Sequence, residues 1–401
     1  MINQQALNTD VLIIGASASG LMCAIEAGKR GRKVVLLDHA NKAGKKILMS
    51  GGGRCNFTNM DIEADRFISG NPHFCKSALR RYTQWDFIAL VKAYHIAYQQ
   101  RDLGKLFCEN SAKDILAMLL AECRKVGVSI CLNHNISTVK RTDSDTFILK
   151  GSHKDTPIIY QAASLVVASG GLSIPKMCAT PFGYQLAEQF GHSIQPTHPG
   201  LVPFTLQLRD RETFQSLSGI SVYCEVSNAR IAFTENLLFT HRGLSGPAIL
   251  QISSYWKNGE TININLLPDM DLVQYLSRCR QQQPRQKLKN VLAERLPRRL
   301  LTVLLDEIIE KPMQEISQQC SKNIADKLQN WMIKPGGTEG YRTAEVTIGG
   351  VNCDELSSRT MESKKLDGLY FIGEVVDVSG WLGGYNFQWA WSSGWCAGQV
   401  V

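Results

Sequence analysis

The sequence lacks long hydrophobic runs, paired cysteine motifs and a signal-like start. No apolar stretch approaches the roughly 20 residues that a membrane-spanning helix requires, and the first ten residues contain no basic region followed by an apolar one. The twelve cysteines are scattered, without a CxxC pair or the Cys/His spacing of a zinc finger. We therefore expect a cytoplasmic protein with reduced thiols, no metal site and no membrane contact.

The charge is unevenly distributed along the 401 residues, which carry +8 in total. Between Arg278 and Arg299 there are eight basic residues and one acidic residue, Glu294, so this segment alone carries +7. Such a segment could meet a nucleic acid or an anionic protein. We favour an ordinary solvated helix surface, because no aromatic residue lies within the segment to stack on bases.

The start of the chain is typical of a βαβ unit. The apolar run Val11–Ile14 predicts a buried strand, 21–30 a helix, and Lys33–Asp38 a second strand. The turn Gly15-Ala-Ser-Ala-Ser-Gly20 fits the dinucleotide pattern G-x-G-x-x-G except at Ser17, which replaces the middle glycine. Asp38 ends the second strand, where a carboxylate can accept both hydroxyls of a ribose; the alternative is an Asp that caps a turn.

The far end of the chain, about 350 residues later, also contains an apolar strand that ends at a glycine. This strand, 368–372, leads into Gly373, and either Asp377 or Glu374 could hold ribityl or ribose hydroxyls. Gly383 and Gly384 precede a final helix, whose N-terminal dipole can stabilise negative charge on a reduced flavin. Two such turns at opposite ends of one chain point to FAD as a resident cofactor more than to NAD as a passing one.

The string Ser50-Gly-Gly-Gly-Arg-Cys-Asn56 is the most unusual in the sequence. Three successive glycines are entropically costly and are expected where the backbone lies against a flat ligand. Arg54 can neutralise a phosphate, and Asn56 can donate to a ring carbonyl. Cys55 is either a redox-active thiol beside a flavin or a packing residue, and packing is favoured because no partner cysteine is near in sequence.

The expected secondary structure changes twice in the middle of the chain. We expect mainly helices over 74–125, short antiparallel strands over 201–267, and helices over 269–333. His241, in the polar string Phe239–Pro247, is a candidate proton donor, although a lone histidine is more often structural. Among the C-terminal tryptophans, Trp391 and Trp395 are expected to pack in the core.

These strings resemble the YhiN/BaiN-like bacterial flavoproteins, also described as aminoacetone-oxidase-like FAD-binding enzymes. The resemblance rests on Leu48–Asn59, Phe239–Pro247, Glu345–Val351, Thr360–Ser363, Gly373–Asp377 and Gly383–Gln388. It implies an α/β fold, in which a glutathione-reductase-like FAD-binding Rossmann domain is interrupted by a β-barrel-like domain carrying a helical insert. The chain departs from the family pattern at Ser17 and in the stretch 176–183. The family includes members linked to amine oxidation and to reduction of steroid-like enones.

The expected domains are an FAD-binding domain over 1–194 and 346–401, a barrel-like domain over 195–268 and 326–345, and a helical insert over 269–325. The catalytic candidates are His241 and Cys55. The residues expected to contact FAD are Gly15, Ala16, Ser17, Ala18, Ser19, Gly20, Asp38, Lys45, Lys46, Ser50, Gly51, Gly52, Gly53, Arg54, Cys55, Asn56, Ile136, Ser169, Gly170, Gly171, Gly373, Glu374, Asp377, Gly383, Gly384, Tyr385, Asn386 and Phe387.

We therefore expect an FAD-dependent oxidoreductase that transfers hydride between flavin N5 and a small organic substrate. No second G-x-G-x-x-G unit is present, so NAD(P)H is expected to bind transiently if it is the reductant. The alternative is an FAD-containing protein that binds or modifies RNA through the basic segment 278–299. A third interpretation, an NAD dehydrogenase without tightly bound flavin, is less well supported.

Overall fold

The computed structural model describes residues 6–154 and 156–401. The chain divides into two compact units, which are described separately. Unit 1 comprises the chain up to His198 together with Val346–Val401, and unit 2 comprises Pro199–Glu345. Among the described residues, no helix combines the length and the apolar character needed to span a bilayer.

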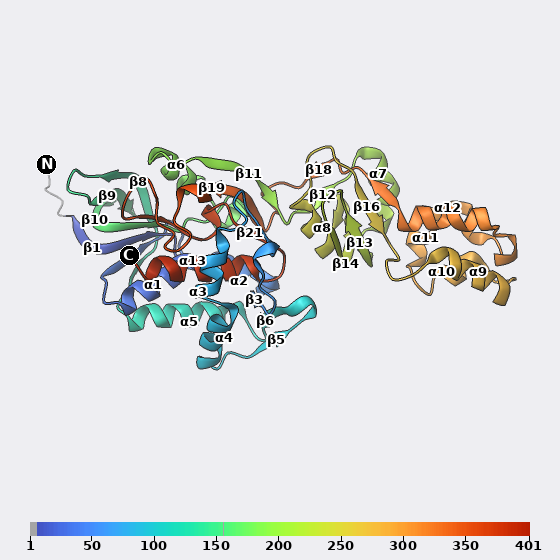
Figure 1. The fold of residues 1–401 in the computed structure, drawn as a ribbon, viewed down its shortest axis with the longest axis horizontal. Helices are drawn as coiled ribbons and strands as arrows, with labels where there is room; N and C mark the ends of the chain where they lie inside the picture. Colours follow the sequence, from blue (N-terminus) through green and yellow to red (C-terminus); the bar gives the residue numbers. More distant parts are fainter. Residues whose placement is uncertain (1–5, 155) are drawn as a thin grey trace. The chain divides into compact units, whose positions relative to one another are not determined.

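Unit 1 is built on a mainly parallel sheet with an antiparallel meander at one side (Figure 1). Its strands are β1 (Leu7–Ile14), β2 (Val34–Leu37), β3 (Asn56–Asn59), β4 (Phe67–Ile68), β5 (Tyr98–Gln100), β6 (Lys105–Cys108), β7 (Ser129–Cys131), β8 (His134–Arg141), β9 (Phe147–His153), β10 (Thr156–Val167), β11 (Ile194–Gly200), β19 (Val346–Val351), β20 (Leu369–Phe371) and β21 (Ser379–Gly380). Its helices are α1 (Ala18–Lys29), α2 (Lys45–Gly53), α3 (Cys75–Arg81), α4 (Gln84–Ala93), α5 (Ala112–Lys125), α6 (Phe182–Gln189) and α13 (Tyr385–Gly398).

The order of the main sheet is β7-β2-β1-β10-β9-β8, and β20 also pairs with β10. The pairs β7–β2, β2–β1, β1–β10 and β10–β20 are parallel, whereas β10–β9 and β9–β8 are antiparallel. β10 belongs to both parts, since its first half pairs with β9 and its last three residues pair with β20. Because β20 comes from the far end of the chain, the two ends share one sheet.

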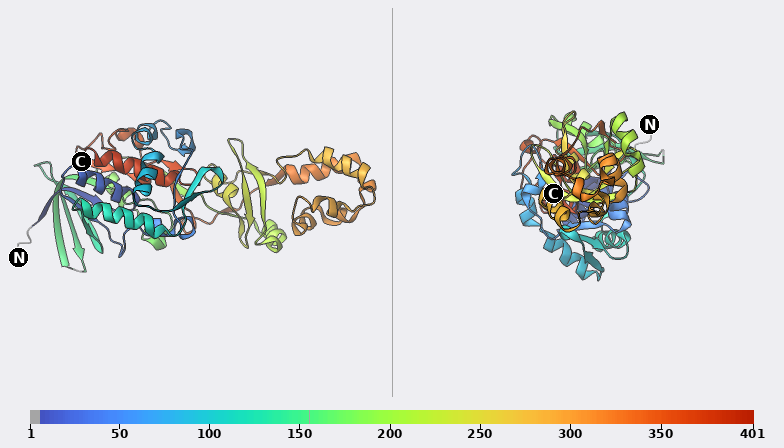
Figure 2. Two further views of the ribbon diagram at one scale, coloured as in Figure 1. Left: turned by 90° about the horizontal axis from the view of Figure 1, so that it is seen from below. Right: turned by 90° about the vertical axis from the view of Figure 1, so that its right-hand side faces the viewer.

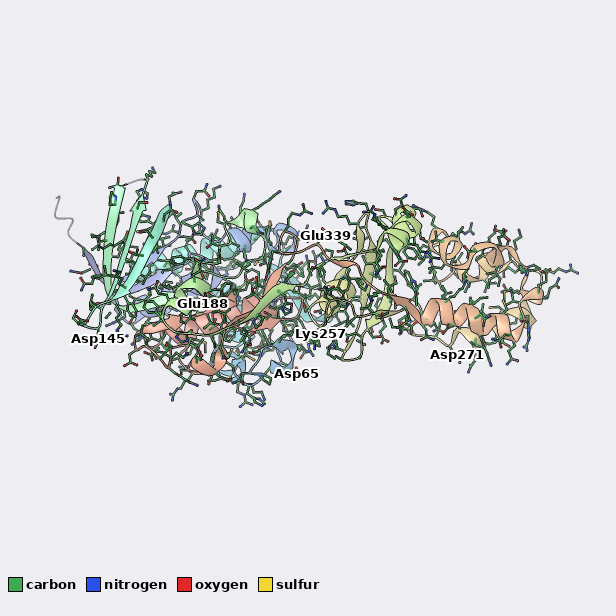
Figure 3. All side chains as sticks on the ribbon, turned by 90° about the horizontal axis from the view of Figure 1, so that it is seen from above. Asp65, Asp145, Glu188, Lys257, Asp271 and Glu339 are labelled. Carbon is green, nitrogen blue, oxygen red and sulfur yellow. The ribbon has the colours of Figure 1, made fainter. Side chains whose placement is uncertain are left out.

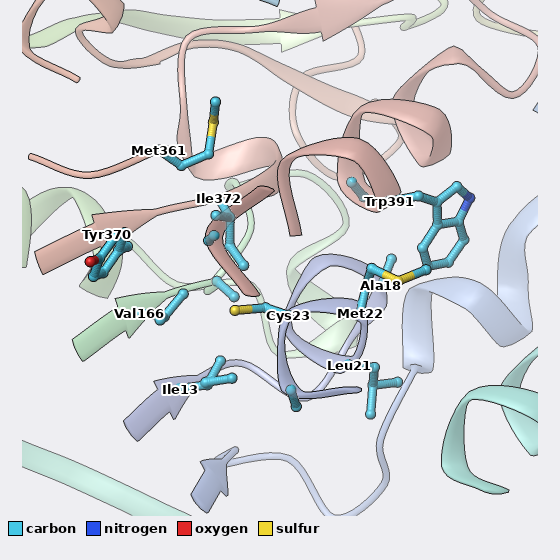
Figure 4. Packing of buried hydrophobic residues seen from close by; sticks show 14 of the residues in the cluster. Ile13, Ala18, Leu21, Met22, Cys23, Val166, Met361, Tyr370, Ile372 and Trp391 are labelled. Carbon is cyan, nitrogen blue, oxygen red and sulfur yellow. The ribbon is translucent and has the colours of Figure 1, made fainter. Parts of the chain in front are cut away.

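The core of unit 1 lies between this sheet and the helices α1, α5 and α13, which lie side by side (Figures 1 and 2). Ile13 of β1, Val166 of β10 and Cys23 of α1 meet in one layer of it (Figure 4). Complete burial of such a side chain contributes about 1.5–3 kcal/mol. The sequence-predicted packing role of Trp391 is confirmed: its ring is fully buried and stacks on Phe87 with the centroids 4.4 Å apart.

One segment of unit 1 differs from the sequence prediction. Residues 74–125 are not mainly helical throughout, because β5 and β6 form an antiparallel hairpin between α4 and α5, and β6 also pairs with β3. These strands are only three and four residues long, which is too short for a period-two pattern to be recognised. Their pairing with β3 is a tertiary contact that local sequence does not encode.

Unit 2 contains a seven-stranded antiparallel sheet and a helical insert (Figure 1). Its elements are β12 (Phe204–Thr205), α7 (Leu208–Phe214), β13 (Ser221–Ser227), β14 (Ala232–Phe239), β15 (Gly243–Ser245), α8 (Pro247–Ser253), β16 (Ile262–Asn265), α9 (Leu272–Gln282), α10 (Leu288–Leu292), α11 (Arg298–Leu305), α12 (Gln318–Gln329), β17 (Trp331–Ile333) and β18 (Gly337–Thr338). The sheet order is β17-β16-β13-β14-β15-β12-β18. The four helices α9–α12 lie between β16 and β17, and Asp271 caps the start of α9 (Figure 3).

Candidate functional site

Four parallel strands of unit 1 end at the same edge of the sheet, and backbone hydrogen bonds continue beyond them. Ligands of open α/β sheets bind outside this edge. From the residues that the sequence nominates for FAD, the turns that follow β1, β2, β10 and β20 contain Gly15–Ser17, Asp38, Ser169–Gly171, Gly373, Glu374 and Asp377. The hydrogen bonds that join these turns run from Gly15 N–H to Leu37 O at 2.8 Å, from Ala168 N–H to Ile14 O at 2.8 Å, and from Ile372 N–H to Val167 O at 3.1 Å.

The turn between β1 and α1 requires its two glycines. Gly15 has a φ of +115°, and a Cβ on it would overlap the carbonyl of Ala168. A Cβ on Gly20 would overlap the carbonyl of Gly15. Ser17 is the N-cap of α1 but makes no capping hydrogen bond with its side chain. Its hydroxyl and the first N–H groups of the helix are therefore suited to an anionic ligand.

Asp38 fixes the second turn of the site. Its carboxylate accepts hydrogen bonds from Ala16 N–H at 2.7 Å and from Ala40 N–H at 2.8 Å. Asp38 thus holds the turn between β1 and α1 in place, and its remaining lone pairs can still accept ribose hydroxyls. The backbone N–H of His134 donates to Asp38 O at 2.9 Å, and Ile136 follows two residues later on β8. This places Ile136 close along the chain to the Asp38 turn.

The three consecutive glycines have φ values of +56°, +66° and +84°, which L side chains rarely adopt. They end α2, where the backbone leaves helical geometry at Ser50. Nothing lies within 4 Å of a Cβ placed on Gly52 or Gly53, so this backbone presents an open, flat surface. Arg54, directly after them, is exposed and pairs with no carboxylate among the residues that the structure describes.

The segment after the glycines is hydrogen-bonded to the start of α13, more than 300 residues away. Asn56, with its amide in the orientation that satisfies both ends, accepts from Gly384 N–H at 3.1 Å. Asn59 donates to Gly383 O at 2.9 Å, and Thr58 donates to Gln388 Oε1 at 2.7 Å. The side chain of Asn56 thus joins two parts of the site rather than standing free for a ligand.

Glu374 is the centre of a polar network that the sequence did not reveal. Its carboxylate accepts from Lys46 Nζ, from Ser173 Oγ and from the backbone N–H of Thr347, each at 2.9 Å. Burial opposes ionisation of Glu374, but these three partners, above all Lys46, outweigh it and hold the pKa of the carboxyl below its ordinary value. Gly171 is required here, because a Cβ on it would lie 2.5 Å from Thr347 Oγ1.

Asp377 lies in a different environment from Glu374. It is 4% exposed and accepts one hydrogen bond, from Gly70 N–H at 2.8 Å. Burial raises its pKa to about 6, against the opposing effect of that hydrogen bond. Among the described residues no positive side chain pairs with this buried carboxylate, so Asp377 takes up a proton more readily than Glu374.

Cys55 is fully buried and has a φ of +44°. Burial raises the pKa of its thiol to about 12, although a hydrogen bond with Ser50 opposes this effect. A thiol with this pKa does not form the nucleophilic thiolate at neutral pH. The structure therefore favours packing over redox chemistry for Cys55.

The helix α13 begins at the site with uncapped N–H groups. Gly384, its N-cap, has a φ of +95°, and a Cβ there would overlap the carbonyl of Thr58. Asn386 braces the preceding loop by accepting from Gly380 N–H and donating to Gly380 O, both at 2.8 Å. Tyr385 donates to Asp61 O at 3.0 Å, and Phe387 stacks on Trp391 in the helix.

Other nominated residues lie elsewhere or have local partners. His241 belongs to unit 2, where it is exposed in the turn between β14 and β15. Lys45 donates to Cys178 Sγ at 3.1 Å. Ser169 and Gly170 follow β10 at the edge that carries the site. Within residues 6–154 and 156–401, no cluster of three His, Cys, Asp or Glu side chains is arranged to hold a metal ion.

The residues at this edge fit an elongated dinucleotide such as FAD. Two helices, α1 and α13, begin there without a side-chain cap, which suits a pyrophosphate and an electron-rich ring. Asp38 offers acceptors for a ribose, and Gly52 and Gly53 offer an unobstructed backbone surface for a flat ring. Turns from both ends of the chain supply these groups, as the sequence predicts.

Comparisons with known proteins show which family the chain belongs to. The family model described as "HI0933-like protein Rossmann domain" matches residues 9–400. The "Ribosomal RNA dihydrouridine synthase" of Escherichia coli is 52% identical over 394 residues, covering 97% of each chain. The "3-dehydro-bile acid delta(4,6)-reductase" of Clostridium scindens is 27% identical over 411 residues, covering 97% of this chain and 98% of that protein.

A solved structure shows the same fold. The 3-ketosteroid-delta4-(5alpha)-dehydrogenase of Rhodococcus jostii aligns with a TM-score of 0.51 at 12% identity, and the alignment covers 99% of this chain and 98% of that one. At this identity the likeness concerns the fold alone. The sequence prediction of an α/β protein with a Rossmann-type FAD-binding domain is confirmed.

Proposed function

The chain belongs to the HI0933-like protein Rossmann domain family, and from that membership we propose that it reduces uridine in ribosomal RNA to dihydrouridine. The chain is an FAD-dependent oxidoreductase, as the sequence predicts. The observation that carries the finer proposal is the 52% identity to a ribosomal RNA dihydrouridine synthase over 97% of both chains. That alignment is long enough to include unit 2 as well as the unit that carries the cofactor site.

The proposed reaction adds a hydride and a proton across the C5=C6 bond of uracil. C6 is the β carbon of an enone formed with the C4 carbonyl, so it accepts the hydride, and C5 takes the proton. FAD, when bound, supplies the hydride, and we propose NAD(P)H as the reductant that replaces its two electrons. The 27%-identical relative is named as a reductase of a 3-dehydro-bile acid, which supports reduction of a double bond near a carbonyl as the shared chemistry.

The residues of unit 1 have separate tasks in this proposal. The uncapped start of α1, with Ser17, binds the pyrophosphate, and Asp38 orients the adenosine ribose. Lys46 keeps Glu374 ionised, and the start of α13 offers N–H donors where negative charge develops on the flavin. His241 is proposed as the proton donor to C5. A water molecule is the alternative donor.

The test is complementation in Escherichia coli that lacks its 52%-identical relative. Expression of this chain should restore dihydrouridine in ribosomal RNA, measured by mass spectrometry of digested nucleosides. The proposal is refuted if the expressed protein contains FAD when purified but the ribosomal RNA of the complemented cells still lacks dihydrouridine. The variant His241→Asn tests the proton donor: it should lower the single-turnover rate of RNA reduction at least about a hundredfold, the lower end of the range for general acids, with unchanged FAD content.

A second candidate function is reduction of a small conjugated ketone. It is favoured by the relative from Clostridium scindens, whose substrate is a small molecule. Reoxidation of the NADPH-reduced flavin by steroid enones, seen as the return of its absorbance, with no reoxidation by ribosomal RNA, would support this candidate over the first.

A further inference from the structure

A cleft in unit 2 has no task in the proposal above. It has a volume of about 790 Å³ and lies between the outward face of β13, the segment before α9, and the helices of the insert. Sites for small ligands commonly enclose about 300–1,000 Å³, so the cleft can accommodate a nucleotide. The side chains that matter here are Tyr223, Asp269, Tyr275, Arg278, Gln282 and Arg295.

The positive charge of the segment 278–299 is not uniformly available. Lys287 and Lys289 both pair with Glu310, at 2.8 and 2.6 Å, so they form an ordinary surface network. Arg280 and Arg299 donate to backbone carbonyls, which fixes their positions. For these residues the solvated-surface interpretation of the sequence is adequate.

Two arginines differ from that group because they line the cleft. Arg278 projects from α9, and Arg295 projects from the link between α10 and α11. In the part of the chain that the structure describes, neither has a carboxylate within ion-pair distance, and both are exposed. Asp269 is the single acidic side chain in the lining, so the lining is net positive.

The cleft also contains the aromatic surfaces that the basic segment itself lacks. Tyr223 lies on β13, where alternate residues are buried, and its own side chain is 51% exposed. Tyr275 lies one helical turn before Arg278 on α9, and the guanidinium of Arg295 lies 5.8 Å from the centre of its ring. An exposed flat ring beside arginines that lack a carboxylate partner is a combination that binds unstacked bases and their phosphates.

We propose that this cleft docks a single-stranded segment of ribosomal RNA, with a base on Tyr223 and phosphates on Arg278 and Arg295. This inference rests on the proposed function, because that function makes RNA the substrate. It adds a binding surface that is separate from the cofactor site. An acidic peptide is a weaker fit, because it would use the arginines but not the exposed ring.

The test measures binding of full-length, FAD-loaded protein to a fluorescein-labelled oligouridylate of roughly 16 nucleotides, the upper end of single-strand site sizes. Tyr223→Ala should weaken binding at least about tenfold, as expected for loss of a base stack, whereas Tyr223→Phe should not. Arg278→Gln should also weaken binding and should reduce the slope of log K against log salt by about 0.7. Tyr223→Ala should leave that slope unchanged.

Two matched controls separate the cleft from general electrostatics. Arg285→Gln removes the same charge from an exposed position of the insert that does not line the cleft. Leu208→Ala removes an exposed apolar side chain, 68% accessible, elsewhere in unit 2. Both should bind the probe within about twofold of wild type. Equal losses in Arg278→Gln and Arg285→Gln, or unchanged binding in Tyr223→Ala with its flavin spectrum intact, would overturn the proposal.

The same set of variants distinguishes failure of the cleft from failure of the proposed function. If Tyr223→Ala and Arg278→Gln restore dihydrouridine as well as wild type does, the cleft proposal fails and the function stands. If the protein forms no dihydrouridine but these two variants selectively lose the probe, the function fails and the cleft stands. Wild-type protein that binds polyglutamate but not the probe at low salt would overturn the cleft proposal in favour of an acidic protein partner.

Discussion

At the residue scale, two neighbouring carboxylates of the C-terminal segment show how partners decide ionisation. Glu374 has an ammonium and two further donors, which hold its pKa below the ordinary value despite burial. Asp377 has one backbone donor, and burial raises its pKa to about 6. The sequence nominated either one as a partner of ribityl or ribose hydroxyls. The structure instead gives Glu374 a fixed charge and Asp377 a charge that depends on pH near neutrality.

Glu355 offers a test of such linkage away from the cofactor site. Its carboxylate accepts from Ser193 N–H at 2.9 Å and from Lys365 Nζ at 2.8 Å. Burial opposes ionisation, but Lys365 and Ser193 outweigh it and lower the pKa from 4.5 to about 2. A depressed folded-state pKa contributes stability that is present above the unfolded value of 4.5 and is lost as pH falls toward 2.

We therefore expect Glu355→Gln to lower the free energy of unfolding near neutral pH by about 1 kcal/mol, a figure reduced for solvent screening. The difference from wild type should shrink as the pH is lowered below 4.5. Urea denaturation of the FAD-loaded proteins over this pH range measures the difference in the free energy of unfolding. Glu188→Gln, which changes an exposed carboxylate without an ion pair in the described part of the chain, is the control. A difference that is independent of pH would contradict the linkage.

At the scale of elements, the contact between α1 and α13 joins the two ends of the chain. A Cβ on Gly394 would lie 2.5 Å from Ser19 O, and one on Gly398 would lie 2.5 Å from Glu26 Cβ. These two glycines therefore let α1 and α13 approach each other closely. The helix α13 also holds the turn after β20 in place, because Gly373 N–H donates to Ser393 Oγ at 3.0 Å.

Gly394→Ala should therefore destabilise the protein, although alanine favours an isolated helix by about 1 kcal/mol over glycine. Overpacking in a well-packed core costs about 1–3 kcal/mol, so we expect a net loss of about 1 kcal/mol together with faster release of FAD. Chemical denaturation and flavin fluorescence measure the two effects. Gly336→Ala, whose added Cβ would lie 3.3 Å from backbone atoms of Leu206 and Gln207, should destabilise the protein less and leave FAD release unchanged. A stabilised Gly394→Ala variant would show that the helices can move apart without cost.

The elements also show which parts of the site local sequence could predict. The βαβ unit and its glycine turn follow from apolar runs and the position of Gly15, which are local signals. The hydrogen bonds from Thr58 to Gln388 and from Lys46 to Glu374 join residues about 330 positions apart, and no periodicity encodes them. The cleft was missed for the same reason, because Tyr223 lies far in sequence from the basic segment that it accompanies.

At the scale of the whole molecule, the chain enters and leaves unit 2 through adjacent backbone segments. Glu345 N–H donates to Leu201 O at 3.2 Å, and Gly336 N–H donates to Thr205 O at 2.8 Å. Unit 2 also has its own aromatic core, in which Trp331 packs against Phe214 with the ring centres 5.2 Å apart. An insertion whose ends lie together and whose core is its own has the properties of an independent domain.

We expect residues 199–345, expressed alone, to fold cooperatively. Circular dichroism should show a sharp thermal transition, and the isolated unit should bind the oligouridylate probe with an affinity close to that of the full chain. The complementary variant, in which a short glycine-serine linker joins 198 to 346, should retain FAD and lose the probe. Failure of 199–345 to unfold cooperatively would show that its core depends on unit 1.

The hydrogen bonds between the glycine-rich segment and the start of α13 also set an order of events during synthesis. Asn59 and Gly383 are 324 residues apart, and at translation rates of about 5–20 residues per second the ribosome needs roughly 15–65 seconds to cover that distance. Until then the nascent polypeptide carries the glycine turn after β1 and Asp38 without the start of α13. On the proposed assignment of the site, capture of FAD is therefore a late event in the life of each molecule, and unit 2 has time to fold before it.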